Sequence, residues 1–291
     1  MADSGFVSAL GSALVSVLDA NTDSGAPPVP PVTLLIIDPQ NDFHPGGTLA
    51  IPTADEDAGR IASFIRNNAR HIERIVVTLD SHERAHIAHG IFWVNGAGEH
   101  PPPFTLISSQ DVARGKWRAY DASKQPAAEE YARKLEETGR FMICIWPEHC
   151  IVGSPGHSVR AAILSALDGW AESRMREVLF VWKGQNCMTE MYSALRAEVP
   201  VPSDERTLLN AGLLRTLRES SQILVCGQAL SHCVNFTVRD LADNYDADRL
   251  GTIGILRDCT SSVPGFEDAG NSFLADMKMK GMRIVTTKSW P

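Results

Sequence analysis

Short apolar segments alternate with amphipathic segments along most of this chain, and no other feature constrains the fold as strongly. Isoleucine and valine dominate the apolar runs, and turn residues or polar clusters flank most of them. Continuous runs of this kind are typical of parallel strands that helices cover on both faces. The runs are Val32–Ile37, Ile75–Leu79, Phe141–Ile145, Val178–Trp182, Ile223–Cys226 and Thr252–Leu256.

Candidate helices lie between and after these runs. They are Asp57–Arg70, Ala127–Glu137, Ser158–Ala171, Glu205–Glu219, Cys233–Asn244 and Glu267–Lys280. Repeated alternation of strand and helix implies right-handed crossovers and helices on both faces of a sheet. We therefore predict a three-layer α/β/α sandwich with a six-stranded, mainly parallel sheet.

The chain divides into a tail and one large domain. Residues 1–31 combine a weak apolar stretch with a proline-rich segment, which is typical of a tail and linker. Residues 32–291 carry the alternating pattern and are expected to form the domain. Residues 86–124 interrupt it without a clear period and with many Gly and Pro residues. A stretch this long inside a compact domain usually covers a functional site.

Composition excludes several classes of partner. The 291 residues carry a net charge of −8 and no conspicuous Lys/Arg cluster, which disfavours nucleic acid and anionic membranes. No apolar run reaches the roughly 20 residues that span a bilayer. Several of the six cysteines lie inside apolar runs, as reduced thiols do, so a cytoplasmic location is expected.

Reactive side chains follow five of the apolar runs. In open α/β sheets the ligand crevice lies at the carboxyl ends of the strands, so these positions are expected to meet at one edge. In chain order they are Asp38, then Asp80 with His82, then His149, then Lys183, and finally Cys233.

Cys233 is the candidate nucleophile. Taken alone, it also fits a buried cysteine at a helix start. Gly227 and Ala229, however, indicate a tight strand-to-helix turn, so the helix should begin close to the thiol. A helix N-terminus favours the thiolate and is expected to lower the pKa of Cys233. The same turn would offer backbone N–H groups to an oxyanion.

Asp38 and Lys183 are the candidate partners of the thiol. An Asp before Pro39 also fits an ordinary turn, and most lysines face solvent. At the ends of central strands, however, both side chains would be half-buried. A desolvated carboxylate could take the thiol proton and return it to a leaving amine.

Asp80, His82 and His149 are the candidate metal ligands. Asp80 and His82 are two residues apart and share one face of an extended segment. One carboxylate and two imidazoles leave coordination positions open, which suits a catalytic metal. An Asp-x-His pair in a surface loop is the alternative. His86 and His89 are interpreted as loop histidines, with support of the ligands as the alternative.

These motifs resemble the isochorismatase-like cysteine hydrolases, and within them the nicotinamidase family. The resemblance spans about residues 32–260 and rests on five segments. They are Asp38-x-Gln-x-Asp-Phe43, Asp80-x-His82, Trp146-Pro-x-His-Cys150, Lys183-Gly184 and Ala229-x-x-x-Cys-Val234. Trp-Pro-x-His-Cys together with Asp-x-His is the more specific part, because metal-free relatives are not expected to carry it.

The resemblance implies a reaction and the residues that carry it. Cys233, Asp38 and Lys183 would hydrolyse a carboxamide through an acyl-thioester. The backbone N–H groups of Ala229 and Cys233 would form the oxyanion hole, helped by a cis peptide before Ala229. Aromatic walls would hold the substrate ring, and the residues that match them are Phe43, Trp146 and His232.

The resemblance also implies a cofactor and a role. One divalent metal ion on Asp80, His82 and His149 would bind a pyridine nitrogen, with zinc expected first and iron or manganese also compatible. The substrate would be nicotinamide or a close aromatic carboxamide, which places the enzyme in NAD salvage. A homo-oligomer is compatible with the family, and the partner is a small molecule rather than a nucleic acid or membrane.

Departures from the family pattern leave two alternatives open. Ser231 stands where the family often has an acidic residue, and His232 where tyrosine is common. These differences surround the substrate, so an isochorismatase-like amidase that acts on another amide or a ureide is the alternative enzyme. A catalytically idle scaffold is the alternative of another class.

Overall fold

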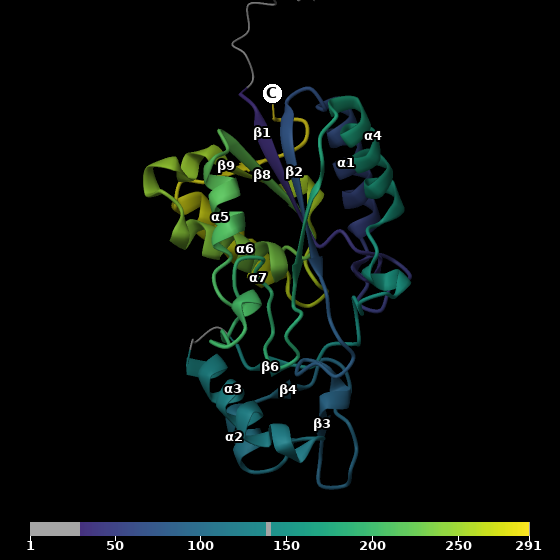
Figure 1. The fold of residues 1–291 in the computed structure, drawn as a ribbon, viewed down its shortest axis with the longest axis vertical. Coiled ribbons are helices and arrows are strands. Elements are labelled where there is room, and N and C mark those ends of the chain that lie inside the picture. The colour runs from purple at the N-terminus through teal and green to yellow at the C-terminus, as the bar shows by residue number, and fades with distance from the viewer. Residues whose placement is uncertain (1–29, 138–140, 291) are drawn as a thin grey trace, which may run out of the picture.

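A six-stranded sheet forms the centre of the computed structural model, which describes residues 30–137 and 141–290 (Figure 1). The strand order is β10-β9-β8-β1-β2-β7, and every neighbouring pair is parallel. The strands are β1 (Val32–Ile37), β2 (Ile72–Asp80), β7 (Leu179–Lys183), β8 (Gln222–Gly227), β9 (Ile253–Leu256) and β10 (Arg283–Val285). The predicted sandwich with a six-stranded parallel sheet is confirmed.

Two groups of helices cover the two faces of the sheet. One face carries α1 (Ala54–Asn67) and α4 (Ala161–Arg174), and the other carries α5 (Ala211–Arg218), α6 (Cys233–Asn244) and α7 (Glu267–Met279). Strand β1 serves both cores because successive side chains point to opposite faces. Leu34 and Ile36 pack with the α1–α4 side, whereas Leu35 and Ile37 pack with the α5–α7 side.

One predicted strand lies outside the central sheet. The run Phe141–Ile145 contains β6 (Ile143–Cys144), which pairs antiparallel with β4 (Leu106–Ile107). Its place in the sheet is taken by β10 at the edge, a segment that the sequence analysis did not assign. Strand β10 contains Arg283 and only two apolar residues, so no continuous apolar run indicated it. Its three residues are only partly buried.

The expectation that helices cover both faces is also wrong at β7. This strand forms the other edge of the sheet, and Phe180 and Trp182 remain 42% and 47% exposed. The predicted helix Glu205–Glu219 likewise divides into a 3-10 turn (Glu205–Thr207) and α5.

Residues 86–124, whose apolar positions follow no regular spacing, fold around a small core of their own. It contains β3 (Trp93–Val94), β4, α2 (Ser109–Ala113) and β5 (Arg118–Ala119), and α3 (Gln125–Glu137) follows it. Apolar residues from these elements form a separate buried cluster. Figure 1 shows this unit beyond the carboxyl ends of the central strands, where the reactive residues were predicted.

The predicted tail lies almost wholly outside the described residues, so the division at residues 31 and 32 stays a prediction. Among the described residues, the longest apolar helices still fall short of what crossing a membrane requires.

Candidate active site

Three strands bring a carboxylate, an ammonium and a thiol into contact. Asp38 follows β1 directly, Lys183 is the last residue of β7, and Cys233 is the first residue of α6. The Lys183 Nζ atom lies 2.9 Å from Asp38 Oδ2 and donates to Cys233 Sγ at 3.6 Å. The structure therefore brings together the three side chains that the strand ends singled out.

Burial and charge set the protonation of this group. Burial opposes the charge on Lys183, but Asp38 and Asp80 outweigh it and raise the pKa of the amine well above its usual value. Burial has the opposite effect on the carboxyl group of Asp38 and raises its pKa, although the Lys183 ammonium opposes this shift. The ammonium therefore keeps its proton, and Asp38 binds a proton more readily than an ordinary aspartate.

The Cys233 thiol differs from the sequence expectation. Burial raises its pKa well above the usual value, although Lys183 opposes the shift. The expectation that the helix N-terminus lowers this pKa is therefore wrong. The cost of removing the thiolate from water outweighs the favourable effect of the helix dipole. Lys183 contacts both the Asp38 carboxylate and Cys233 Sγ, so a base stands close to the thiol.

A tight turn leads from β8 to the thiol. Gly227 has a φ of 108°, and a Cβ there would lie 2.0 Å from the Ile37 carbonyl oxygen, so only glycine fits. The Gln228–Ala229 peptide is cis. The Gln228 side chain donates to Asp57 at 2.9 Å, which ties the turn to α1.

A second cluster lies beside the thiol and contains the predicted metal ligands. Asp80 Oδ1 lies 3.3 Å from His82 Nε2, and Asp80 Oδ2 lies 3.4 Å from His149 Nε2. His82, His89 and His149 each present a ligand atom within 4.8 Å of the others. Asp80 joins this cluster to the thiol group, because Lys183 Nζ also contacts Asp80 Oδ1 at 3.0 Å.

His89 is a candidate metal ligand that the sequence analysis considered only as a loop histidine or as support for the ligands. It is fully buried rather than a surface-loop histidine, and so is His86. The His89 ring donates from Nδ1 to the Arg84 carbonyl at 3.1 Å, as His149 does to the Pro147 carbonyl at 2.8 Å. Both rings therefore have Nδ1 fixed by a backbone carbonyl and leave Nε2 facing the cluster, an orientation that is common among imidazole ligands of metals.

His86 has a different role because both of its ring nitrogens are occupied. Nε2 donates to the Thr189 carbonyl at 3.2 Å, and Nδ1 accepts from the Ala88 amide at 3.2 Å. Burial, as the largest cause, lowers the pKa of His86 to about 4. His86 is therefore a neutral positioning residue, although it lies near His82 and Glu190.

The residues of this cluster fit a metal ion. Both nitrogens of His82 and Nε2 of His89 are buried and have no hydrogen-bond partner among the described residues. Unpaired buried polar atoms are costly unless an unseen partner satisfies them. Gly184, with a φ of 74°, leaves room beside these atoms, since a Cβ there would lie 2.7 Å from Asp80 Oδ1 and 3.0 Å from the His82 ring. A divalent ion suits this donor set of nitrogen and oxygen.

A cavity joins the two clusters. Cys233 and Ala229 line it, and so do Asp80, His149 and Glu190. Its walls are largely apolar or aromatic, and they comprise Phe43, Leu49, Trp146, Tyr192, His232 and Val263.

The aromatic residues of the cavity hold one another in place. Trp146 donates from Nε1 to the Tyr192 hydroxyl at 3.0 Å, and its ring packs edge-on against His232 at 5.1 Å. Phe43 packs against His149 at 5.6 Å. Burial lowers the pKa of His232 to about 4, so its imidazole is neutral. Tyr192 and Glu190 belong to the long connection after β7, where no period pointed to them.

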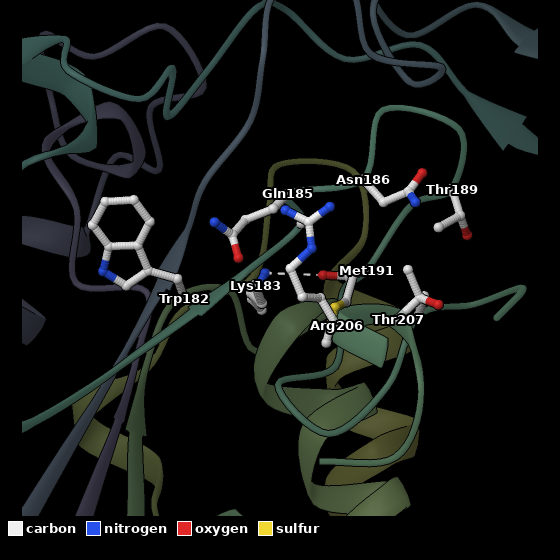
Figure 2. Close-up of a pocket in the computed structure, with 10 residues that line it drawn as sticks. Trp182, Lys183, Gln185, Asn186, Thr189, Met191, Arg206 and Thr207 are labelled. Carbon is white, nitrogen blue, oxygen red and sulfur yellow. Dashed lines mark hydrogen bonds between the residues drawn. The ribbon is translucent and has the colours of Figure 1, made fainter. Parts of the chain in front are cut away.

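A second cavity lies against Lys183 near Gln185 and Arg206 (Figure 2). The Lys183 amine donates to the Met191 carbonyl at 3.1 Å on this side. The lining residues of this cavity include no thiol, imidazole or carboxylate. The cavity that contains Cys233 is therefore the candidate reaction site.

Comparisons with known proteins find relatives that match most of the chain. No family model matches the chain. The chain is 25% identical to a nicotinamidase of Escherichia coli over 267 residues, which cover 90% of this chain and 98% of that protein. An Acinetobacter baumanii nicotinamidase and pyrazinamidase aligns with 88% of this chain and 96% of its own, with a TM-score of 0.59 and 21% identity. A Pyrococcus horikoshii pyrazinamidase in complex with zinc aligns with 88% of this chain and 99% of its own, with a TM-score of 0.52 and 20% identity.

Proposed function

We propose that this chain, which belongs to the isochorismatase-like nicotinamidase family, hydrolyses nicotinamide or a close aromatic carboxamide to the acid and ammonia. One observation carries the proposal. An ammonium lies within 2.9 Å of a carboxylate and 3.6 Å of a thiol, at a cavity that also reaches an imidazole cluster. Covalent catalysis on an amide needs a nucleophile, a base and a charge stabiliser in contact, and this group supplies all three.

Asp38 acts first, as the base that takes the proton of Cys233. Its raised pKa suits this role, because a base works best when its pKa approaches the operating pH. The Lys183 ammonium offsets the negative charge that moves onto sulfur. The buried thiol therefore becomes a thiolate as the substrate binds, rather than beforehand.

The thiolate then attacks the carboxamide carbon and forms a C–S bond. The backbone N–H groups of Ala229, in the turn after β8, and of Cys233, the first residue of α6, stabilise the oxyanion. The C–N bond breaks as Asp38 returns its proton to the departing nitrogen, so ammonia leaves and an acyl-thioester remains on Cys233. Water, deprotonated by Asp38, hydrolyses the thioester to the acid and restores the thiol.

Asp80, His82 and His149 would hold the divalent ion, and the free Nε2 of His89 lies within reach of the same position. When bound, the ion supplies a Lewis acid for the ring nitrogen of a pyridine. Phe43, Trp146 and His232 would position the ring between apolar walls. The zinc complex of the Pyrococcus horikoshii relative supports zinc as the first candidate.

Ammonia release from nicotinamide by the purified, metal-loaded protein tests this proposal. Activity that disappears in Cys233→Ala and persists in Cys259→Ala, a buried thiol remote from the cavity, supports it. Hydrolysis of an aliphatic amide or a ureide, with none of nicotinamide, would instead support the alternative substrate class. Full activity of Cys233→Ala on nicotinamide would refute the mechanism.

A further inference from the structure

The proposed reaction leaves one buried carboxylate of the cavity without a role. Glu190 is 4% exposed, and it lines the same cavity as Cys233 and His149. Its Oε2 atom is buried and has no hydrogen-bond partner among the described residues. A buried carboxylate oxygen in this state is costly, so it indicates a partner that binds there.

Several contacts fix Glu190 in this position. Its backbone N–H donates to the Tyr131 hydroxyl of α3 at 3.2 Å, and its carbonyl accepts from the Glu198 amide at 2.9 Å. Its Oε1 atom accepts from the Met191 amide at 2.9 Å. Contacts with helix α3 and with the connection after β7 thus hold Glu190 in place, and its side chain lines the cavity.

The position of the carboxylate matches that of a metal ligand. Glu190 Oε1 lies 3.5 Å from His82 Nε2, and Asp80 Oδ1 lies 3.3 Å from the same nitrogen. Two donor atoms bound to one ion at about 2.1 Å lie roughly 3.0 to 3.4 Å apart. His82 therefore stands between two carboxylates, each near the separation expected for donors that share an ion.

Charge balance supports the same conclusion. Asp38, Asp80 and Glu190 are buried together, and Lys183 is the cation that contacts the first two. Glu190 has no Lys or Arg partner among the described residues and faces the His82 ring instead, so a cation bound there would offset its charge. His86 is no competing ligand beside Glu190, because its two ring nitrogens already have partners.

We propose that Glu190 is a further ligand of the metal centre, so that the ion is held by two carboxylates in addition to imidazoles. The inference rests on the proposed function, since it concerns the same metal. A second carboxylate shifts the preference of a site from Zn²⁺ toward Mn²⁺, which favours oxygen ligands and six-coordination. The connection after β7 would thus set which metal the enzyme uses.

Metal affinity of Glu190→Gln, measured by chelator competition with Mn²⁺ and Zn²⁺ in turn, tests the proposal. The amide preserves shape and removes the charge. We expect Mn²⁺ affinity to fall by about 10- to 100-fold, and Zn²⁺ affinity to fall less. Glu190→Asp, which keeps a carboxylate on a shorter side chain, should retain more Mn²⁺ affinity than Glu190→Gln.

Two controls separate the inference from the proposed function. Tyr192→Phe alters the same cavity without removing a carboxylate or an imidazole, and should leave both affinities unchanged. His82→Ala should lose both metals. Wild-type affinities in Glu190→Gln would overturn the inference, and a higher KM alone would make Glu190 a substrate contact. Wild-type affinities in His82→Ala would instead refute the metal centre itself.

Discussion

The thiol cluster and the imidazole cluster meet at Asp80 but differ in how complete they are. Lys183 donates or ion-pairs to Asp38, Asp80, the Met191 carbonyl and Cys233, so the thiol side is satisfied by the chain itself. His82 by contrast has two buried nitrogens without hydrogen-bond partners among the described residues, and its Nε2 faces only the carboxylates of Asp80 and Glu190. The chain thus builds its own nucleophile and base, whereas the imidazole side offers donor atoms that fit a divalent ion.

Asp38→Asn should have the largest effect, and it tests whether the thiol side acts alone. The amide cannot take the thiol proton, so kcat for ammonia release should fall by about 10³- to 10⁴-fold. Metal content should stay at the wild-type value because Asp38 lies on the thiol side. Loss of metal in this variant would show that the two clusters cannot be separated.

Lys183→Met removes the residue that links the two clusters. Asp38 and Asp80 would remain buried with no ammonium, which should lower the free energy of unfolding by about 3–5 kcal/mol. Urea unfolding measures this loss.

Lys116→Met is the matched control for this change. Lys116 pairs with Asp111 on the surface, where ion pairs contribute at most about 1 kcal/mol. Equal losses in the two variants would contradict the assignment of Lys183 as a buried link.

Gly184→Ala tests the imidazole side. The added Cβ would press against Asp80 Oδ1 and the His82 ring, so metal affinity should fall on the order of 10-fold. Gly98→Ala provides the control, because Gly98 has a similar φ of 81° and nothing within 4 Å of an added Cβ. Chelator competition compares the two variants, and equal affinities would show that the space beside Gly184 does not serve a metal.

His232 should give the smallest effect, a change in the pH dependence of stability. Burial lowers its pKa to about 4, below the unfolded value of about 6.5, so the unfolded chain binds the proton first as pH falls. This contribution to stability is complete above pH 6.5 and is lost as pH falls toward 4. The free energy of unfolding of His232→Gln should therefore decline less between pH 7 and pH 4.5 than that of the wild type. Parallel declines would show that the ring is not buried as a neutral group.

The sequence analysis predicted the thiol side well because strand ends have a simple geometry. Asp38, Lys183 and Cys233 each lie at the boundary of a strand or helix, and parallel strands carry their carboxyl ends to one edge. The same rule failed for Phe141–Ile145, although His149 still reaches the site between two parallel bridges, Trp146 to His89 and Ile151 to His82. The helical start at Cys233 was also foreseen, but not the extent of burial that raises the thiol pKa.

The site residues that the sequence did not indicate belong to segments whose apolar positions follow no regular spacing. His89 lies in the stretch between β2 and β3, and Glu190 and Tyr192 lie in the connection after β7. Their positions depend on long-range contacts, such as the Tyr131 hydroxyl that holds Glu190, and no local pattern encodes these contacts. The roles of the predicted site residues stay predictions until the variants are measured.

Mass spectrometry of the protein quenched during turnover tests the central claim most directly. If Cys233 carries the substrate, a nicotinoyl group should be found on the peptide that contains Cys233, and on no other cysteine peptide. Ammonia release from nicotinamide without any acyl group on Cys233 would contradict the account.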